Sequence, residues 1–161
     1  MLGAERERFT VRIFATDLDP AAVAYARRGV YSRNALAPLP PDLVERYFIP
    51  LNGAYEVSKL VRSLVVFGEH DLGQRAPFPH IDLCLCRNVL IYFNRRLQDR
   101  VHHVLYDSLA NFGVLGLGAK ETLLLTPLQD RYEELNAPHR LYRRMVRRSR
   151  CEDRVDCGGV T

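Results

Sequence analysis

The sequence lacks any apolar segment long enough to cross a membrane as a helix. Its first residues, 1–8, also lack the apolar core of a signal peptide. With 161 residues, of which 47% are hydrophobic and 26% charged, the chain has the length and composition of one globular domain. These features predict a cytoplasmic protein that does not insert into a membrane.

The sequence also has few cysteines, and their positions do not suggest a disulfide framework. Cys84 and Cys86 would lie on one face of a single strand, whereas Cys151 and Cys157 lie in a polar tail. No other cluster of metal ligands accompanies the first pair. We therefore interpret Cys84 and Cys86 as core residues and expect no metal site.

The net charge of +4 comes largely from arginines near the carboxyl terminus. They are Arg140, Arg143, Arg144, Arg147, Arg148 and Arg150. Such a run is usually a solvated tail, although it can also meet nucleic acid or an acidic surface. The basic residues lack interleaved aromatic residues across a defined face, so we expect no nucleic acid as a partner. We predict that residues 146–161 form a disordered basic and polar tail.

The most informative stretch covers residues 81–93. Its first part is an almost continuous apolar run, which predicts a strand buried on both faces. Arg87 and Asn88 follow at the carboxyl end of this strand, where open α/β sheets bind their ligands. The next residues are again apolar around one phenolic hydroxyl, that of Tyr92. This pattern predicts a functional site.

Near the amino terminus, residues 9–16 predict a strand and residues 21–28 a helix. Asp19 precedes a proline and is predicted to cap the helix, which Gly29 ends in a left-handed conformation. Since Asp19 is used for capping, Asp17 is left at the strand tip. A carboxylate in that position accepts hydrogen bonds from ribose hydroxyls in nucleotide-binding sheets, but a solvated turn aspartate explains it equally well.

Residues 30–67 interrupt this alternation of strand and helix. Residues 42–47 predict a short helix. Asn52 and Gly53 lie between two apolar runs and predict a hairpin with a type I′ turn. We interpret the whole segment as a small antiparallel sheet inserted into an α/β fold. It is either a docking surface or an ordinary structural hairpin.

Further along the chain, Asp71 and Leu72 follow another apolar run. Asp71 is placed either to accept a hydrogen bond from the exocyclic amine of a base or to cap the turn. Asn94 is predicted to cap a long amphipathic helix that ends at Gly113, with His102 and His103 at its surface. Further strands are predicted at residues 114–118 and through residues 141–142.

Four segments together resemble one family. They are residues 15–19 (Ala-Thr-Asp-Leu-Asp), 26–31 (Ala-Arg-Arg-Gly-Val-Tyr), 86–93 (Cys-Arg-Asn-Val-Leu-Ile-Tyr-Phe) and 117–121 (Leu-Gly-Ala-Lys-Glu). In this order they resemble the CheR family, the chemotaxis receptor glutamate O-methyltransferases. The resemblance extends from about residue 11 to residue 145 and includes the hairpin insertion.

The resemblance implies an α/β fold with a Rossmann-like class I methyltransferase sheet over residues 1–145, and S-adenosylmethionine as methyl donor. By position, Asp17 would bind the ribose hydroxyls, and Asp71 with Leu72 would hold the adenine. Arg87 and Asn88 would line the methionine side of the cofactor. Tyr92 would lie beside the reacting methyl group.

The inserted sheet at 30–67 resembles a subdomain that grips the receptor in some members. The implied partners are the glutamate-bearing cytoplasmic helices of methyl-accepting receptors.

Methyl transfer to a glutamate side chain agrees with the absence of a Ser/His/Asp or Cys/His constellation from the sequence. A glutamate side chain has a reference pKa near ~4.3 and is anionic at neutral pH, so its methylation requires no general base. Alignment of the reactants should supply most of the catalysis.

The chain also departs from the family. The first strand, the glycine-containing loop after it and a helical amino-terminal domain would all precede Phe9. The sequence therefore predicts an incomplete sheet with a hydrophobic edge. The sequence is consistent with two functions: an amino-terminally truncated methyltransferase domain, and a non-catalytic module that docks to receptors.

Overall fold

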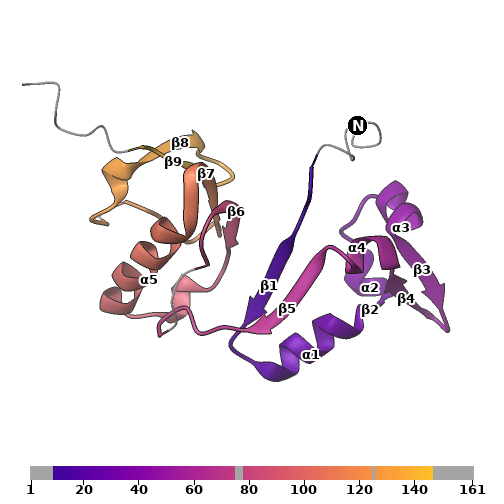
Figure 1. The fold of residues 1–161 in the computed structure, drawn as a ribbon. Helices are drawn as coiled ribbons and strands as arrows, with labels where there is room; N and C mark the ends of the chain where they lie inside the picture. The colour runs from indigo at the N-terminus through magenta and orange to yellow at the C-terminus, as the bar shows by residue number, and fades with distance from the viewer. Residues whose placement is uncertain (1–8, 75–77, 125, 147–161) are drawn as a thin grey trace, which may run out of the picture. The chain divides into compact units, whose positions relative to one another are not determined.

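The computed structural model describes residues 9–74, 78–124 and 126–146 of a mixed α/β chain. The chain divides into two compact units, residues 1–71 and residues 72–161. Figure 1 labels the elements of each. Apart from Val146, the predicted disordered tail lies outside the described residues.

The first unit contains a parallel pair of strands joined through a helix. Strand β1 (Ile13–Asp17) leads into helix α1 (Pro20–Arg28) and pairs with β5 (Val65–Glu69). The Asp19 side chain accepts a hydrogen bond of 2.8 Å from the backbone N–H of Ala21, which confirms the predicted cap. Gly29 ends the helix at φ 68°, also as predicted. Strand β1 begins four residues later than predicted.

An antiparallel sheet lies between α1 and β5 in the chain. It contains β2 (Val30–Ser32), β3 (Phe48–Leu51) and β4 (Ala54–Val57) in the order β2-β4-β3. Asn52 and Gly53 have φ of 42° and 81°, as a type I′ turn requires, so the hairpin prediction is confirmed. The remaining elements of this segment are the helices α2 (Arg33–Leu36), α3 (Pro41–Tyr47) and α4 (Lys59–Arg62). The last residues of the predicted insertion, 65–67, belong to β5.

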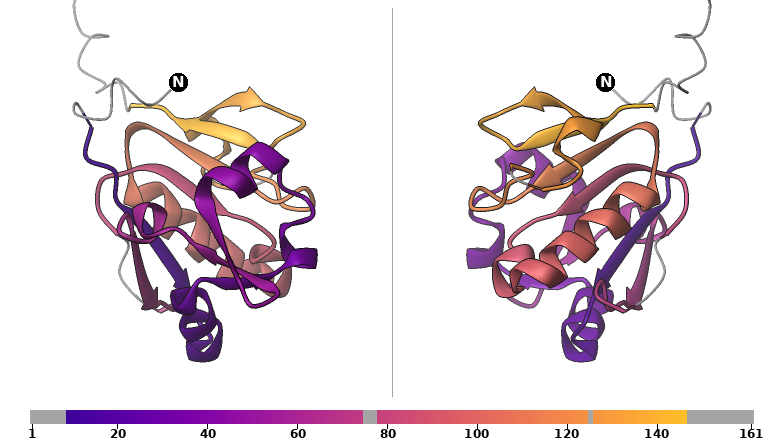
Figure 2. Two further views of the ribbon diagram at one scale, coloured as in Figure 1. Left: turned by 90° about the vertical axis from the view of Figure 1, so that its right-hand side faces the viewer. Right: turned by 90° about the vertical axis from the view of Figure 1, so that its left-hand side faces the viewer.

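The second unit is built around a four-stranded sheet. Its strands are β6 (Ile81–Cys86), β7 (Leu109–Leu117), β8 (Tyr132–Asn136) and β9 (Leu141–Arg144), in the order β6-β7-β9-β8. Strands β6 and β7 are parallel and the other pairs are antiparallel. Between them come the 3-10 turns η1 (Leu90–Tyr92) and η2 (Gln129–Arg131) and helix α5 (Arg95–Ser108). Figure 2 shows α5 and β7 side by side in both views.

The sequence predicted the start of α5 but not its end. The Asn94 side chain accepts a hydrogen bond of 3.0 Å from the Leu97 N–H, which confirms the predicted cap. The helix ends at Ser108 and not at Gly113, which lies inside β7. A Cβ at Gly113 would come within 2.9 Å of the Ile81 carbonyl oxygen, so the glycine permits the close approach of two strands.

One face of the β6–β7 pair forms the core with α5. Val101 and Leu105 of the helix pack in the same cluster as Leu115 and Leu117 of the strand. Cys86 belongs to this cluster and is 5% exposed, which confirms its predicted place in the core. Among the described residues, no group of three His, Cys, Asp or Glu side chains is arranged to hold a metal ion.

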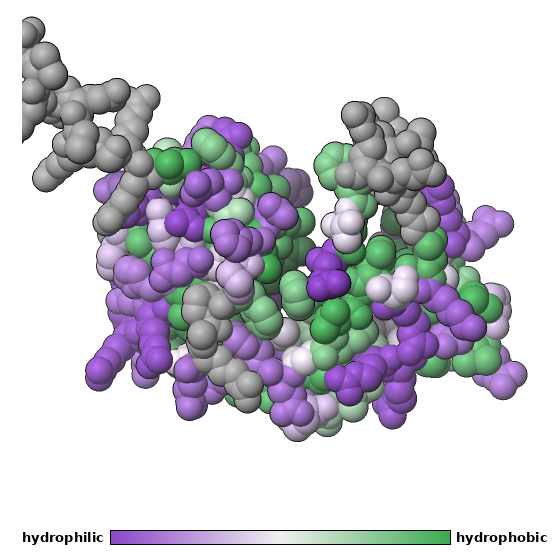
Figure 3. Space-filling view, in the orientation of Figure 1, coloured by the Kyte–Doolittle hydropathy of each residue, from purple (hydrophilic) through white to green (hydrophobic). Residues whose placement is uncertain are grey.

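The prediction that both faces of β6 are buried is wrong for the described part of the chain. Leu83 and Leu85 are 58% and 64% exposed, because α5 covers only the opposite face. An apolar run has the same appearance whether one or both faces are covered, so the sequence pattern could not separate these cases. Figure 3 shows hydrophobic residues at the surface of each unit.

The helices of the described residues are too short or too polar to span a membrane.

The two faces of the sheet differ in how much they contribute to stability. Leu115 is fully buried, so we expect Leu115→Ala to lower the free energy of unfolding by about 2–5 kcal/mol. Leu83→Ala, on the exposed face of β6, should lower it by less than about 1 kcal/mol. Urea unfolding of both variants measures the difference, and equal losses would contradict this assignment of faces.

Candidate functional site

Two acidic residues follow the carboxyl ends of the parallel strands β1 and β5. Asp17 is the last residue of β1, and Asp71 comes two residues after β5. The backbone N–H of His70 donates to the Asp17 carbonyl at 3.0 Å, so the two chain segments stay adjacent beyond the strands. This part of the first unit therefore presents carboxylate oxygens where parallel sheets bind ligands.

Asp17 is less free than the sequence suggested. Its Oδ1 accepts a hydrogen bond of 2.9 Å from the Asp19 N–H, so Asp17 and Asp19 both stabilise the turn into α1. The Asp17 side chain is nevertheless exposed, and its second oxygen accepts no hydrogen bond from the described residues. That oxygen remains available to a ligand.

Leu72 differs in character from Asp71, although the two are neighbours in the sequence. Its side chain is partly buried and packs against the hydrophobic cluster of the second unit. Asp71 is assigned to the first unit and Leu72 to the second.

The predicted polar residues of the second unit follow β6. Arg87 and Asn88 come directly after the strand and are exposed. Tyr92, the last residue of η1, is 80% exposed. None of these three side chains forms a hydrogen bond with another described residue, so their polar groups are free to meet a ligand. The structure thus groups Asp17 with Asp71 in one unit, and Arg87, Asn88 and Tyr92 in the other.

Sequence reasoning assigned no role to Glu121, although this residue ends one of the four segments that resemble the family. It is 4% exposed and follows the end of β7. Its Oε1 accepts hydrogen bonds of 2.7 Å from the N–H groups of both Val89 and Leu90. Its Oε2 accepts from the N–H groups of Asn88 at 3.0 Å and Gly118 at 2.6 Å. All four donors are backbone groups, which every residue type except proline carries, so no pattern in the sequence marked this network.

The network leaves no room for a side chain at Gly118. A Cβ there would lie 2.5 Å from Asn88 Oδ1, 2.7 Å from Glu121 Oε2 and 2.8 Å from the Asn88 nitrogen. Asn88 itself has φ 60°, in the left-handed region that asparagine tolerates better than most residues. Glycine at position 118 is thus explained by the lack of space for a Cβ, and asparagine at position 88 by its positive φ.

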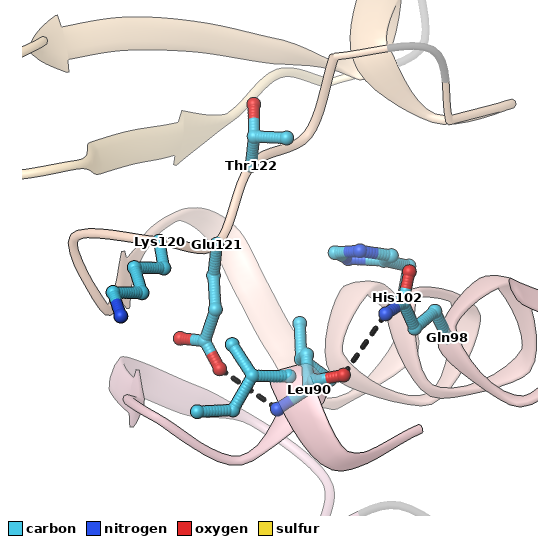
Figure 4. Close-up of a pocket in the computed structure, with 7 residues that line it drawn as sticks. Leu90, Gln98, His102, Lys120, Glu121 and Thr122 are labelled. Atoms are coloured by element: carbon cyan, nitrogen blue, oxygen red, sulfur yellow. Dashed lines mark hydrogen bonds between the residues drawn. The ribbon is translucent and has the colours of Figure 1, made fainter. Parts of the chain in front are cut away.

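A cavity of about 80 Å³ lies beside Glu121 and is shown in Figure 4. It is lined by Leu90, Ile91, Gln98, His102, Lys120, Glu121 and Thr122. Gln98 donates through Nε2 to the carbonyl oxygens of Leu90, at 2.9 Å, and Phe93, at 3.0 Å. The cavity thus borders the contacts that hold η1 on both sides.

The prediction that His102 lies at the surface is wrong. His102 is 3% exposed, and its Nδ1 has no hydrogen-bond partner among the described residues. It follows Val101 directly and lies four residues after Gln98, so it shares the buried side of α5. His103 is exposed as predicted. Burial lowers the pKa of His102 below its usual value of 6.5; Asp99 and Glu121 oppose this shift, whereas Arg95 and His103 add to it.

The cysteines next to the site are not activated for chemistry. Burial, followed by the neighbouring Cys84 and Glu121, raises the pKa of Cys86 to about 12. Burial also raises the pKa of Cys84. Both side chains are thiols at neutral pH, which suits core residues and not nucleophiles.

Two arginines of the basic carboxyl-terminal run have structural contacts. Arg143 forms an ion pair of 2.7 Å with Glu133 across β8 and β9. The Arg144 guanidinium lies 4.3 Å from the centre of the Tyr106 ring and donates to the Leu109 carbonyl. Arg147, Arg148 and Arg150 lie outside the described residues.

Comparison with known proteins places these features in one family. Residues 1–141 match the family model described as the CheR methyltransferase, SAM binding domain. The chain is 37% identical over 141 residues to Cher3 of Pseudomonas putida, covering 82% of this chain and 51% of that protein. It is 30% identical over 121 residues to chemotaxis protein methyltransferase 2 of Vibrio cholerae, covering 73% and 42%.

A third relative is much longer than this chain. It is a 104.1 kDa protein of Rhodobacter capsulatus, 35% identical over 133 residues, which cover 83% of this chain and 14% of that protein. The chain therefore spans about half or less of the length of these relatives.

The buried His102 should make stability depend on pH. The unfolded chain binds a proton near pH 6.5, whereas the folded chain binds it only at lower pH, so the free energy of unfolding should fall as the pH drops through 6.5. His102→Gln should flatten this dependence between pH 7.5 and 5.5 in urea unfolding experiments. An unchanged slope in His102→Gln would refute the assignment.

Proposed function

This chain belongs to the CheR methyltransferase family, and from that premise we propose that it acts in S-adenosylmethionine-dependent methylation of glutamate side chains on chemotaxis receptors. The strongest support is the exposed polar end of β6, where Arg87, Asn88 and Tyr92 have no hydrogen-bonding partner among the described residues. Polar groups that no other part of the described chain uses are suited to a ligand. The family implies S-adenosylmethionine as the methyl donor.

The side chains present fit this cofactor in their chemistry. The carboxylates of Asp17 and Asp71 would accept hydrogen bonds from ribose hydroxyls and the adenine amine, while Leu72 would offer an apolar contact to the base. The guanidinium of Arg87 would pair with the carboxylate of the methionine part, and the Asn88 amide would hydrogen-bond there. When bound, the cofactor supplies a methyl group activated by a positively charged sulfur.

The substrate requires little from the protein besides orientation. A glutamate side chain is already a carboxylate at neutral pH, so its methylation needs no general base in the protein. Tyr92 would donate a hydrogen bond from its hydroxyl to this carboxylate and hold one oxygen toward the methyl group. A well-oriented pair of reactants gains an effective molarity of about 10⁵ M or more, which is the main contribution we assign to the chain.

A receptor-docking module without catalysis is the second candidate. It is favoured by the edge strand β3, on which Ile49 and Leu51 are 53% and 42% exposed. An exposed strand edge with apolar side chains can receive a peptide as an additional strand. Receptor binding by a chain that does not bind the cofactor would support this function over the enzyme.

Isothermal titration with S-adenosylhomocysteine, the product of the donor, tests cofactor binding by the purified chain. We expect micromolar affinity, weakened roughly tenfold to a hundredfold by Asp17→Ala, because the lost hydrogen bonds involve a charged group. Asp130→Ala, at an exposed aspartate of η2, is the matched control and should bind like the wild type.

Circular dichroism would establish that each protein is folded before titration. A folded wild type without measurable binding would refute the enzyme proposal for this chain. Equal affinity in wild type and Asp17→Ala would instead refute the role of Asp17.

The hydroxyl of Tyr92 can be tested separately from cofactor binding. We expect Tyr92→Phe to lower the rate of methyl transfer to receptor cytoplasmic domains roughly tenfold or more, with unchanged affinity for S-adenosylhomocysteine. Transfer is measured as base-labile methyl ester formed from radiolabelled donor. Tyr25→Phe, at a half-exposed tyrosine of α1, is the control. A wild-type rate in Tyr92→Phe would exclude this role.

A further inference from the structure

The segment of residues 87–93 carries three of the proposed site residues, yet two side chains from other parts of the chain hold its backbone. We propose that Glu121 and Gln98 are positioning residues that fix this segment and so orient Arg87, Asn88 and Tyr92. This inference rests on the proposed function. It assigns to both residues a role that neither composition nor motif spacing suggested.

Glu121 holds the first half of the segment. Its carboxylate accepts hydrogen bonds from three consecutive N–H groups, those of residues 88, 89 and 90, at 2.7–3.0 Å. Consecutive N–H groups point to one anion where the backbone turns sharply or begins a helical turn; here the chain turns at Asn88, with its φ of 60°, and η1 begins at Leu90. The carboxylate therefore stabilises the conformation in which Arg87 and Asn88 are exposed, with the Asn88 side-chain oxygen packed over Gly118.

The fourth hydrogen bond connects this segment to the neighbouring strand. The N–H of Gly118, directly after β7, donates to the same Oε2 that accepts from Asn88. Glu121 thereby joins the carboxyl ends of the parallel strands β6 and β7 through one buried group. A side chain at the surface could not provide such a fixed connection, because water would compete for the same donors.

Gln98 holds the second half of the segment. Figure 4 shows its amide directed at the Leu90 carbonyl, on the side of Leu90 opposite to Glu121. Its Nε2 also donates to the Phe93 carbonyl, so both ends of η1 are attached to α5. The helix is in turn anchored by Val101 and Leu105, which are 0% and 3% exposed. Tyr92 thus extends from a turn whose backbone is held by a rigid helix.

The exposure of each side chain indicates whether the residue could contact a ligand directly or only position other residues. Glu121 is buried at 4% exposure, whereas Tyr92 is 80% exposed and Arg87 and Asn88 are exposed. Glu121 therefore acts on a ligand through the segment and does not touch it. Displacements of about 1 Å in a site that works by orientation have large effects on rate.

The test is made with the full chain and the variants Glu121→Gln and Gln98→Ala. Glu121→Gln keeps the size of the side chain but replaces one oxygen by an N–H₂ group that cannot accept a hydrogen bond. Gln98→Ala removes both donors to η1 and keeps a good helix former, so it provides a second test if Glu121→Gln does not fold. Glu133→Gln, the same change in an exposed ion pair, is the control.

Two probes distinguish positioning from stability. S-adenosylhomocysteine contains the amino acid part that Arg87 and Asn88 would bind, and methylthioadenosine contains the same nucleoside without it. At temperatures where all variants are folded, we expect both site variants to lose at least tenfold in affinity for the first ligand and less than twofold for the second. Hydrogen exchange by NMR should show faster exchange of amides 88, 89, 90 and 118 in Glu121→Gln.

The outcomes separate this inference from the function on which it rests. A wild type that binds neither ligand would overturn the proposed function and, with it, the role of Glu121. Wild-type binding with unchanged affinity in both variants would overturn the positioning role alone. Equal losses for both ligands would also overturn it, because they would indicate a general structural effect. Selective loss of S-adenosylhomocysteine affinity, absent in Glu133→Gln, supports it.

Discussion

The second unit depends on one buried carboxylate. Strands β6 and β7 end side by side, and the chain leaves each of them with N–H groups that have no partner in the sheet. Buried backbone donors without partners are costly, so each must find an acceptor. Glu121 has two oxygens with room for about four hydrogen bonds, and it receives four. The close packing of Gly118 against Asn88 follows from this arrangement.

In the segment of residues 87–93, the groups that hold the backbone are buried, whereas the polar side chains proposed to bind ligands are exposed. Glu121, Gln98 and the core face of α5 lie on the inner side of the segment that follows β6. Arg87, Asn88 and Tyr92 are exposed, and their side chains have no hydrogen-bond partners among the described residues. The proposed methyl transfer to a carboxylate would need little acid–base chemistry from the protein and would depend mainly on the geometry of the reactants. A rigid backbone with free polar side chains meets those demands.

The features that the sequence predicted well depend on residues close together in the chain. The caps at Asp19 and Asn94, the turn at Asn52 and Gly53, and the strand at Ile81–Cys86 all follow from local conformational preferences. The role of Glu121 could not be predicted, because its partners are backbone groups up to 33 residues away. His102 was misplaced because histidine is usually polar enough to stay at the surface, whereas here it lies beside Val101 in the core. The Rossmann-like order of one continuous sheet stays a prediction.

The nature of the partners explains why this carboxylate can fix a backbone so firmly. A lysine or arginine partner would sit on a flexible side chain and would follow the carboxylate if it moved. Backbone N–H groups cannot do so, since each is set by the φ and ψ angles of its own chain. Four such donors from two separate segments fix the position of the carboxylate. The carboxylate in turn fixes the position of one segment relative to the other. A displacement of the chain after β7 would therefore also displace Asn88, because the buried Glu121 carboxylate is hydrogen-bonded to both segments.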